Sequence, residues 1–179
     1  RGSGSEFARD AGEVVEELLS SRDRRVLEML VAVLRTKTLA ETQVERLVAA
    51  AGSDDSDAHR TYVWIVLAGS GSGAAGRYLE QTLVRKVDEG QVIDFVEAIQ
   101  QPGRAEVRLL TKLYEARSSD AVRDAIARMM CVDRYEARIE ESAQDQYFAW
   151  IVERSPVERH VLEAARRATN RPGVRTAAS

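Results

Sequence analysis

The sequence predicts an all-α protein of about ten helices, stacked as antiparallel helical hairpins in a solenoid or as two tandem small bundles. Three observations predict this fold class. Apolar residues recur at spacings of three and four along nearly the whole chain, which is the period of a helix. Four segments begin with a capping box, in which Ser, Thr or Asp is followed three residues later by Glu. The three prolines all stand at a break or at a predicted helix start.

The composition is that of an ordinary folded protein, with 44% hydrophobic and 31% charged residues among 179. The formal charge of −3 gives no general attraction to nucleic acid or to anionic membranes. No apolar run approaches the roughly 18 residues needed to cross a bilayer. The single cysteine, Cys131, cannot form an internal disulfide, so we take the cytoplasm as the default location. The first seven residues, RGSGSEF, have the composition of a cloning linker.

The first fifty residues carry three predicted helices. Asp10 to Glu13 forms an acidic capping box ahead of the first. Arg24 to Arg35 places its Val and Leu residues on one face, and Thr38 to Glu41 caps a third helix of the same period. The segment Gly52 to Asp57 is rich in Asp and Ser, which favour a turn and can cap the next helix.

Two structures compete for the segment Tyr62 to Glu80. An apolar run is followed by Gly71-x-Gly73-x-x-Gly76. If the run is a strand, the glycines have the spacing of a dinucleotide-binding turn, and Asp94 lies near where a ribose-binding acid is expected. If the run is a helix, the glycines form a flexible joint between two buried helices.

The segment that carries Asp94 favours the helical alternative. Its apolar residues fall at helical spacing rather than alternating as in a strand: Val92, Phe95, Val96 and Ile99. We therefore predict that the helix after the glycine loop continues to Gly90, and that another helix spans Gln91 to Ile99. Nucleotide binding by the glycine loop is kept as an alternative function.

The second half of the chain repeats the same signals. Pro102-Gly103 breaks the chain, and a helix with one apolar side spans Arg104 to Arg117. Ser119 caps the next helix. Asp133 to Glu136 opens a long helix, and Ser155 to Glu158 opens the last one with a serine cap, a proline and a glutamate.

We predict two helical units that pack as one continuous structure. Residues 1–7 are linker, residues 8–100 form the first unit, residues 101–170 form the second, and residues 171–179 are a flexible tail. The apolar spacing of Val26 to Ala49 recurs at Val107 to Met130, and Tyr62 to Val66 resembles Tyr147 to Val152. Offsets of about 80 to 86 residues suggest an internal repeat.

No catalytic, cofactor or metal-binding set can be assembled from the sequence. The two histidines, His59 and His160, have no prominent Cys, His or carboxylate at a ligand spacing, and Cys131 lies in an apolar run. Adjacent carboxylates such as Glu140 and Glu141 diverge by about 100° around a helix, so they do not face each other. We therefore predict no enzyme activity, no cofactor and no metal.

The predicted function is a protein–protein interaction module: a scaffold, adaptor or regulatory domain that docks a partner helix or peptide on a helical surface. The expected binding residues are aromatic and arginine side chains near the C-terminus: Tyr147, Trp150, Arg154, Arg166 and Arg167. The partner is another protein, and a homo-oligomer is compatible with the sequence. A second alternative is RNA binding by arginines that gather on one face.

Overall fold

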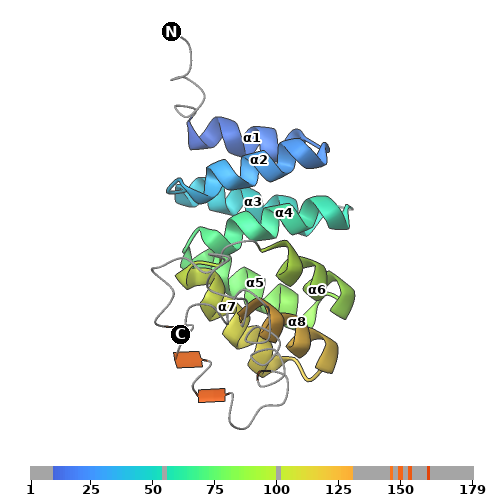
Figure 1. Ribbon diagram of the computed structural model, residues 1–179. Helices are drawn as coiled ribbons and strands as arrows, with labels where there is room; N and C mark the ends of the chain where they lie inside the picture. Colours follow the sequence, from blue (N-terminus) through green and yellow to red (C-terminus); the bar gives the residue numbers. More distant parts are fainter. Residues whose placement is uncertain are drawn as a thin grey trace, which may run out of the picture. The chain divides into compact units, whose positions relative to one another are not determined.

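The computed structural model describes residues 10–53, 56–99 and 102–130, and beyond them the single positions Gln146, Ala149, Trp150, Glu153, Arg154 and Val161. These residues are helical apart from the connecting turns, and no strand occurs among them (Figure 1). The predicted all-α class is therefore confirmed. The three long ranges contain eight helices. The two further helices predicted after Asp133 and Ser155 lie largely outside the described residues, so the total of about ten stays a prediction.

The packing divides the chain into two units, Arg1–Thr82 and Leu83–Ser179, with the dividing line inside the fifth helix. The division predicted between residues 100 and 101 follows the break at Pro102-Gly103 and stays a prediction. The helices, in chain order, are α1 (Ala11–Ser20), α2 (Arg24–Arg35), α3 (Glu41–Ser53), α4 (Asp57–Gly69), α5 (Gly73–Arg85), α6 (Glu89–Ala98), α7 (Arg104–Ala116) and α8 (Asp120–Met130).

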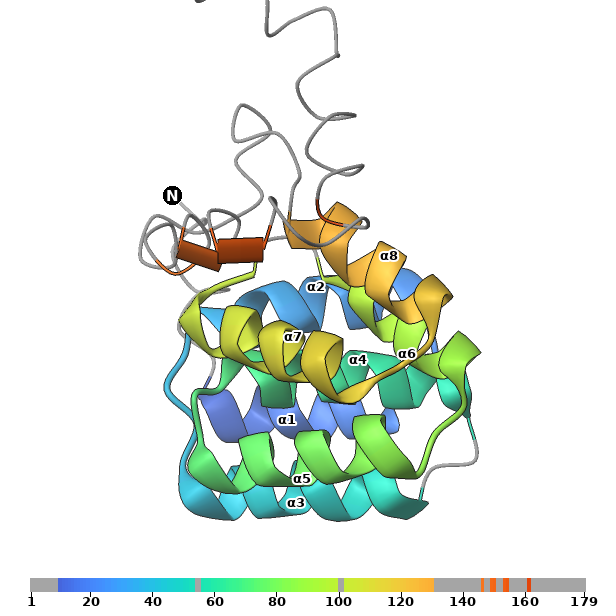
Figure 2. The same ribbon diagram turned by 90° about the horizontal axis from the view of Figure 1, so that it is seen from below.

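In the first unit, the first four helices enclose one apolar core. α1 packs on α2 and on α3, and α4 packs on the same two helices (Figures 1 and 2). Each helix contributes the apolar stripe that its sequence period predicts. The larger core side chains are Val14, Val15, Leu18, Leu27, Leu30, Leu34, Val44, Leu47, Val63 and Trp64.

Helix α4 is the most deeply buried element of this unit. Six consecutive residues, Val63 to Ala68, are all buried, so the helix is covered around its whole circumference. The helix is also tied to α1 by a hydrogen bond from His59 Nε2 to the carbonyl oxygen of Leu18, at 2.8 Å. The apolar run that could have been a strand is therefore a core helix.

In the second unit, α8 packs against both α6 and α7. Its core includes Val92, Phe95, Leu110, Leu113 and Ile126. Arg117, which follows α7, donates hydrogen bonds to two backbone carbonyls, that of Leu83 at 3.0 Å from Nε and that of Val87 at 2.9 Å from Nη2. The guanidinium thereby satisfies the Leu83 carbonyl in the last turn of α5, together with the Val87 carbonyl in the turn that follows this helix.

The boundary between α5 and α6 differs from the prediction. Gly90 was expected to end a helix, but it lies in the first turn of α6. The break comes earlier, because the side chain of Asp88 accepts a hydrogen bond from the Gln91 amide at 2.9 Å and so caps α6. An aspartate that can cap a helix overrides the weaker signal of a single glycine.

One other helix start differs from the sequence signals, and at a further helix the start is as predicted but its cap was missed. The predicted cap at Thr38 is placed too early, since α3 begins at Glu41 and the Gln43 side chain accepts a hydrogen bond from the Ala40 amide at 2.9 Å. At α7 the sequence analysis missed a cap: Glu106 accepts a hydrogen bond from the Gly103 amide at 3.1 Å. Both cases use the reaching-back half of a capping box without a Ser or Thr partner.

Substitutions at the N-terminal caps of α2 and α1 test whether side-chain capping hydrogen bonds stabilise these helices. Asp23 accepts hydrogen bonds from the amides of Arg25 (2.8 Å) and Val26 (3.3 Å), whereas Asp10, at the same position of α1, makes no capping hydrogen bond. We expect Asp23→Ala to lower the free energy of unfolding by about 1 kcal/mol, measured by urea denaturation. Asp10→Ala is the matched control and should cost clearly less. Equal losses would show that the side-chain hydrogen bonds are not the cause.

Candidate functional site

The glycine loop joins two helices. Gly71 lies between the end of α4 and the start of α5, Gly73 is the first residue of α5, and Gly76 lies within α5. A dinucleotide-binding turn requires a strand before the glycines, and residues 57–69 are helical instead. The loop therefore lacks the structural context that gives this glycine spacing its meaning. Asp94, the predicted ribose-binding acid, lies exposed on α6.

Serine side chains organise this loop. Ser70 Oγ donates to the Leu67 carbonyl at 2.7 Å and accepts a hydrogen bond from the Ser72 amide at 3.2 Å. Gly71, between them, has a φ of 68°, in the left-handed region that side chains avoid. The glycine is thus required by the turn itself.

Trp150 and Arg154, two of the five predicted binding residues, lie together against α7. Trp150 is only 3% exposed, and its ring meets the ring of Tyr114 edge to face at 5.3 Å between centroids. Arg154 lies over Trp150, with its guanidinium carbon 5.3 Å from the ring centroid, and forms an ion pair with Glu115 at 2.5 Å. A second arginine, Arg123 on α8, lies over Tyr114 at 5.6 Å.

Trp150 is therefore a core residue, with its ring in contact with Tyr114 and Arg154. A side chain so deeply buried offers a partner almost no surface. The other predicted binding residues, Tyr147, Arg166 and Arg167, lie outside the described residues, and their role stays a prediction. The surface that the described residues offer to a partner must be sought elsewhere.

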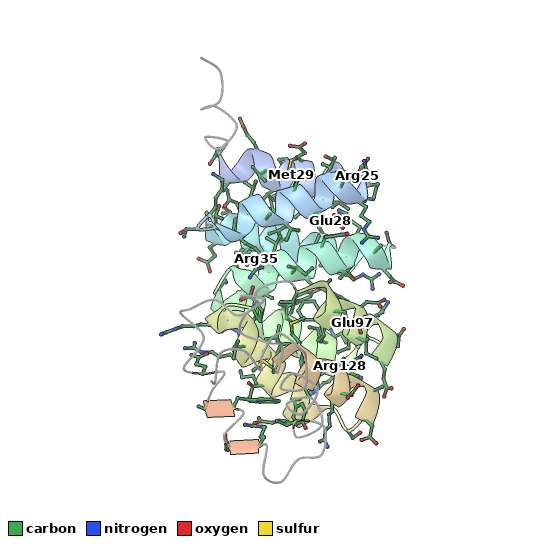
Figure 3. All side chains as sticks on the ribbon, in the orientation of Figure 1. Arg25, Glu28, Met29, Arg35, Glu97 and Arg128 are labelled. Carbon is green, nitrogen blue, oxygen red and sulfur yellow. The ribbon has the colours of Figure 1, made fainter. Side chains whose placement is uncertain are left out.

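The most unusual surface residue is Met29 on α2. Within the part of the chain that the structure describes, it is the only large hydrophobic side chain that is exposed, at 55%. The exposed side of α2 around it, called here the outer face, consists of Arg25, Glu28, Met29, Ala32 and Thr36. Figure 3 shows Arg25, Glu28 and Met29 along α2, with Arg35 nearer its C-terminal end.

The outer face carries both signs of charge. Arg24 Nε donates to Glu28 Oε1 at 2.9 Å, and this hydrogen bond, together with the nearby negative charge, raises the pKa of the Arg24 guanidinium. The Tyr62 hydroxyl on α4 donates to the same carboxylate at 3.5 Å. Arg25, by contrast, forms no ion pair with any residue that the structure describes. Its charge is therefore available to a partner.

The sequence analysis missed the outer face for a clear reason. The helical period of α2 identifies the buried stripe, Leu27, Leu30, Val31 and Leu34, and Met29 falls outside it. The sequence signal that could have revealed the outer face is a methionine that lies outside this buried stripe. Single exposed apolar residues are common on protein surfaces. Met29 is informative because no other large hydrophobic side chain among the described residues is exposed.

No known protein family, curated protein or solved structure matches this chain. None of the described helices is long and apolar enough to span a membrane. Residues 10–53, 56–99 and 102–130, with the isolated positions after them, contain no group of three His, Cys, Asp or Glu side chains placed to hold a metal ion.

The burial of Trp150 can be tested by substitution. We expect Trp150→Ala to lower the free energy of unfolding by about 3 to 5 kcal/mol, since it removes a large buried side chain and leaves a cavity against Tyr114. Met29→Ala, on the exposed surface, is the control and should change it by about 0.5 kcal/mol or less. If the two losses in chemical denaturation were similar, Trp150 would be a surface residue after all.

Alanine substitutions at two glycines of this segment should change the free energy of unfolding in opposite directions. Gly71→Ala should lower the free energy of unfolding by about 1 kcal/mol, because its φ of 68° strains any residue with a Cβ. Gly76→Ala should raise it by about 0.5 to 1 kcal/mol, since a Cβ there meets no atom within 4 Å and the residue is helical. A loss at Gly76 as large as that at Gly71 would contradict the helix–loop–helix interpretation.

Proposed function

We propose that this protein is a protein–protein interaction module, not an enzyme, and that it docks a helix of its partner on the outer face of α2. The observation that carries the proposal is the exposure of Met29 at the centre of a charged and polar surface. Protein interfaces have this composition, with an apolar centre and a polar rim. Methionine adapts its shape to a partner and is frequent at binding surfaces.

The position of Met29 on a rigid helix supports the proposal. The opposite side of α2 is fixed in the core by Leu27, Leu30 and Leu34, and its N-terminus is capped by Asp23. A partner therefore meets a surface that is already ordered, and little conformational entropy is lost at α2 on binding. A helix suits this surface best, because helices pack by interlocking their side-chain rows.

The order of the helices supports a repeated architecture within this proposal. α1, α2 and α3 begin at Ala11, Arg24 and Glu41, and α6, α7 and α8 begin at Glu89, Arg104 and Asp120, an offset of about 80 residues in each case. The apolar patterns of the sequence suggest the same offset. We propose that the two triplets are copies of one unit in a solenoid-like or tandem-bundle protein, an architecture typical of binding modules.

Site-specific photo-crosslinking tests the proposed function. A photoreactive amino acid is placed at Met29 and, as a matched control, at Ala49, an exposed residue of α3. In cells that produce the protein, position 29 should yield an adduct whose partner residue, mapped by mass spectrometry, lies on a helix. Position 49 should yield none.

A second variant links the adduct to binding. With the partner so identified, Met29→Lys should weaken the complex about 30-fold, as for a residue at the centre of an interface. Equal crosslinking at positions 29 and 49, or an unchanged affinity for Met29→Lys, would refute a binding role for the outer face.

A further inference from the structure

We infer that the helix docked on α2 is α2 of a second copy of this chain, antiparallel to the first and related to it by a two-fold axis. This inference rests on the proposed function and names its partner. It goes beyond an interaction surface in general, because it specifies which residues of the two copies meet.

The first argument is the spacing along the outer face. Its central line consists of residues separated by four, three and four positions, which is the pattern of a coiled-coil seam: Arg25, Met29, Ala32 and Thr36. All four are exposed. The residues that hold α2 in its own core lie on the opposite side, so the described helices pack on that side and not on this seam.

The second argument is the fit of this seam to itself. When two copies of α2 run antiparallel, Met29 lies opposite the partner's Ala32, and Ala32 lies opposite the partner's Met29. A large side chain thus meets a small one twice, as interlocking packing requires. At the ends of the seam, Arg25 lies opposite the partner's Thr36. The Thr36 hydroxyl donates to the Val33 carbonyl at 2.8 Å, which leaves its oxygen free to accept from a guanidinium.

The third argument is charge complementarity beside the seam. Glu28 and Arg35 flank it on one side and lie seven residues apart, so the antiparallel arrangement brings Glu28 to the partner's Arg35 and Arg35 to the partner's Glu28. Two oppositely charged pairs therefore form around one axis. Glu28 already accepts from Arg24, and Arg35 also has an interaction within its own chain, but a carboxylate can accept from several donors and a guanidinium has five N–H donors. On the other side, the half-exposed Val26 lies opposite the partner's Val33.

The same residues disfavour a parallel pair. In parallel register, Arg25 would lie opposite the partner's Arg25, and Glu28 would lie beside the partner's Val33 and gain no charged partner. The antiparallel arrangement is the one in which both charge and size are matched. A single pair of helices buries less surface than a stable dimer needs, so the association is weak and depends on concentration.

Charge reversal tests the inference, with the dimer dissociation constant measured by sedimentation over a range of concentrations of the full chain. Glu28→Arg and Arg35→Glu should each raise this constant by about tenfold or more, since each places two like-charged pairs at the interface. The double variant should restore dimers. An equimolar mixture of the two single variants should also dimerise, because the mixed pair satisfies both contacts.

The control is an acidic and a basic residue that pair on another helix of the chain. Asp124 and Arg128 on α8 are 3.2 Å apart and four residues apart, and Asp124→Arg and Arg128→Glu should leave the dissociation constant unchanged. A disulfide test is independent of charge. In a Cys131→Ser background, Met29→Cys mixed with Ala32→Cys should crosslink faster than Met29→Cys with itself.

The outcomes separate this inference from the proposed function. A wild-type chain that stays monomeric at millimolar concentration, or single variants that do not rescue each other, would overturn the antiparallel dimer. If the adduct at position 29 then contains a different protein, the proposed function stands and only the second-copy partner is wrong. If the adduct contains this same chain and the charge swap restores dimers, both are supported.

Discussion

A helix that is apolar around its whole circumference is stable in water only if other elements cover all of its sides. Helix α4 imposes this constraint on the first unit through its six consecutive buried residues, Val63 to Ala68. Each of the larger ones contributes about 1.5 to 3 kcal/mol when fully buried. α2 and α3 pack on α4, and both also pack on α1. Because α2 is held in this way from one side only, its other side is presented to solvent as an ordered surface.

Arginine has a comparable role in the second unit. Arg117 satisfies the carbonyls of Leu83 and Val87, and Arg154 covers the ring of Trp150 while it pairs with Glu115. A planar guanidinium can donate in several directions and stack on a ring, which an ammonium group does less well. The sequence contains only three lysines. At Arg117 and Arg154 the use of arginine in place of lysine therefore has a structural benefit, whatever the origin of this preference.

The sequence predicted the helical class but not the exposed outer face of α2, for different physical reasons. Helical period is a local property, so the spacing of Val92, Phe95, Val96 and Ile99 was enough to favour helices over a strand-based dinucleotide fold. Caps are local too, but several residue types compete for them: Asp88 prevailed over the break expected at Gly90, and the cap that Glu106 provides was missed. Burial of Trp150 depends on Tyr114 and Glu115, more than thirty residues away, and no local pattern predicts that contact. Met29 was missed because periodicity identifies the side of a helix that is buried and says nothing about the side that is not.

The two tryptophans have a spectroscopic consequence. Trp64 lies in the first unit and Trp150 in the second, and both are buried with an arginine over the ring, Arg60 at 5.9 Å and Arg154 at 5.3 Å. Each unit therefore carries one tryptophan in an environment that is lost on unfolding. Replacing either tryptophan by phenylalanine leaves tryptophan emission from the other unit alone. The fluorescence of this protein can thus report separately on each half of the chain, and can distinguish one cooperative unfolding transition from two.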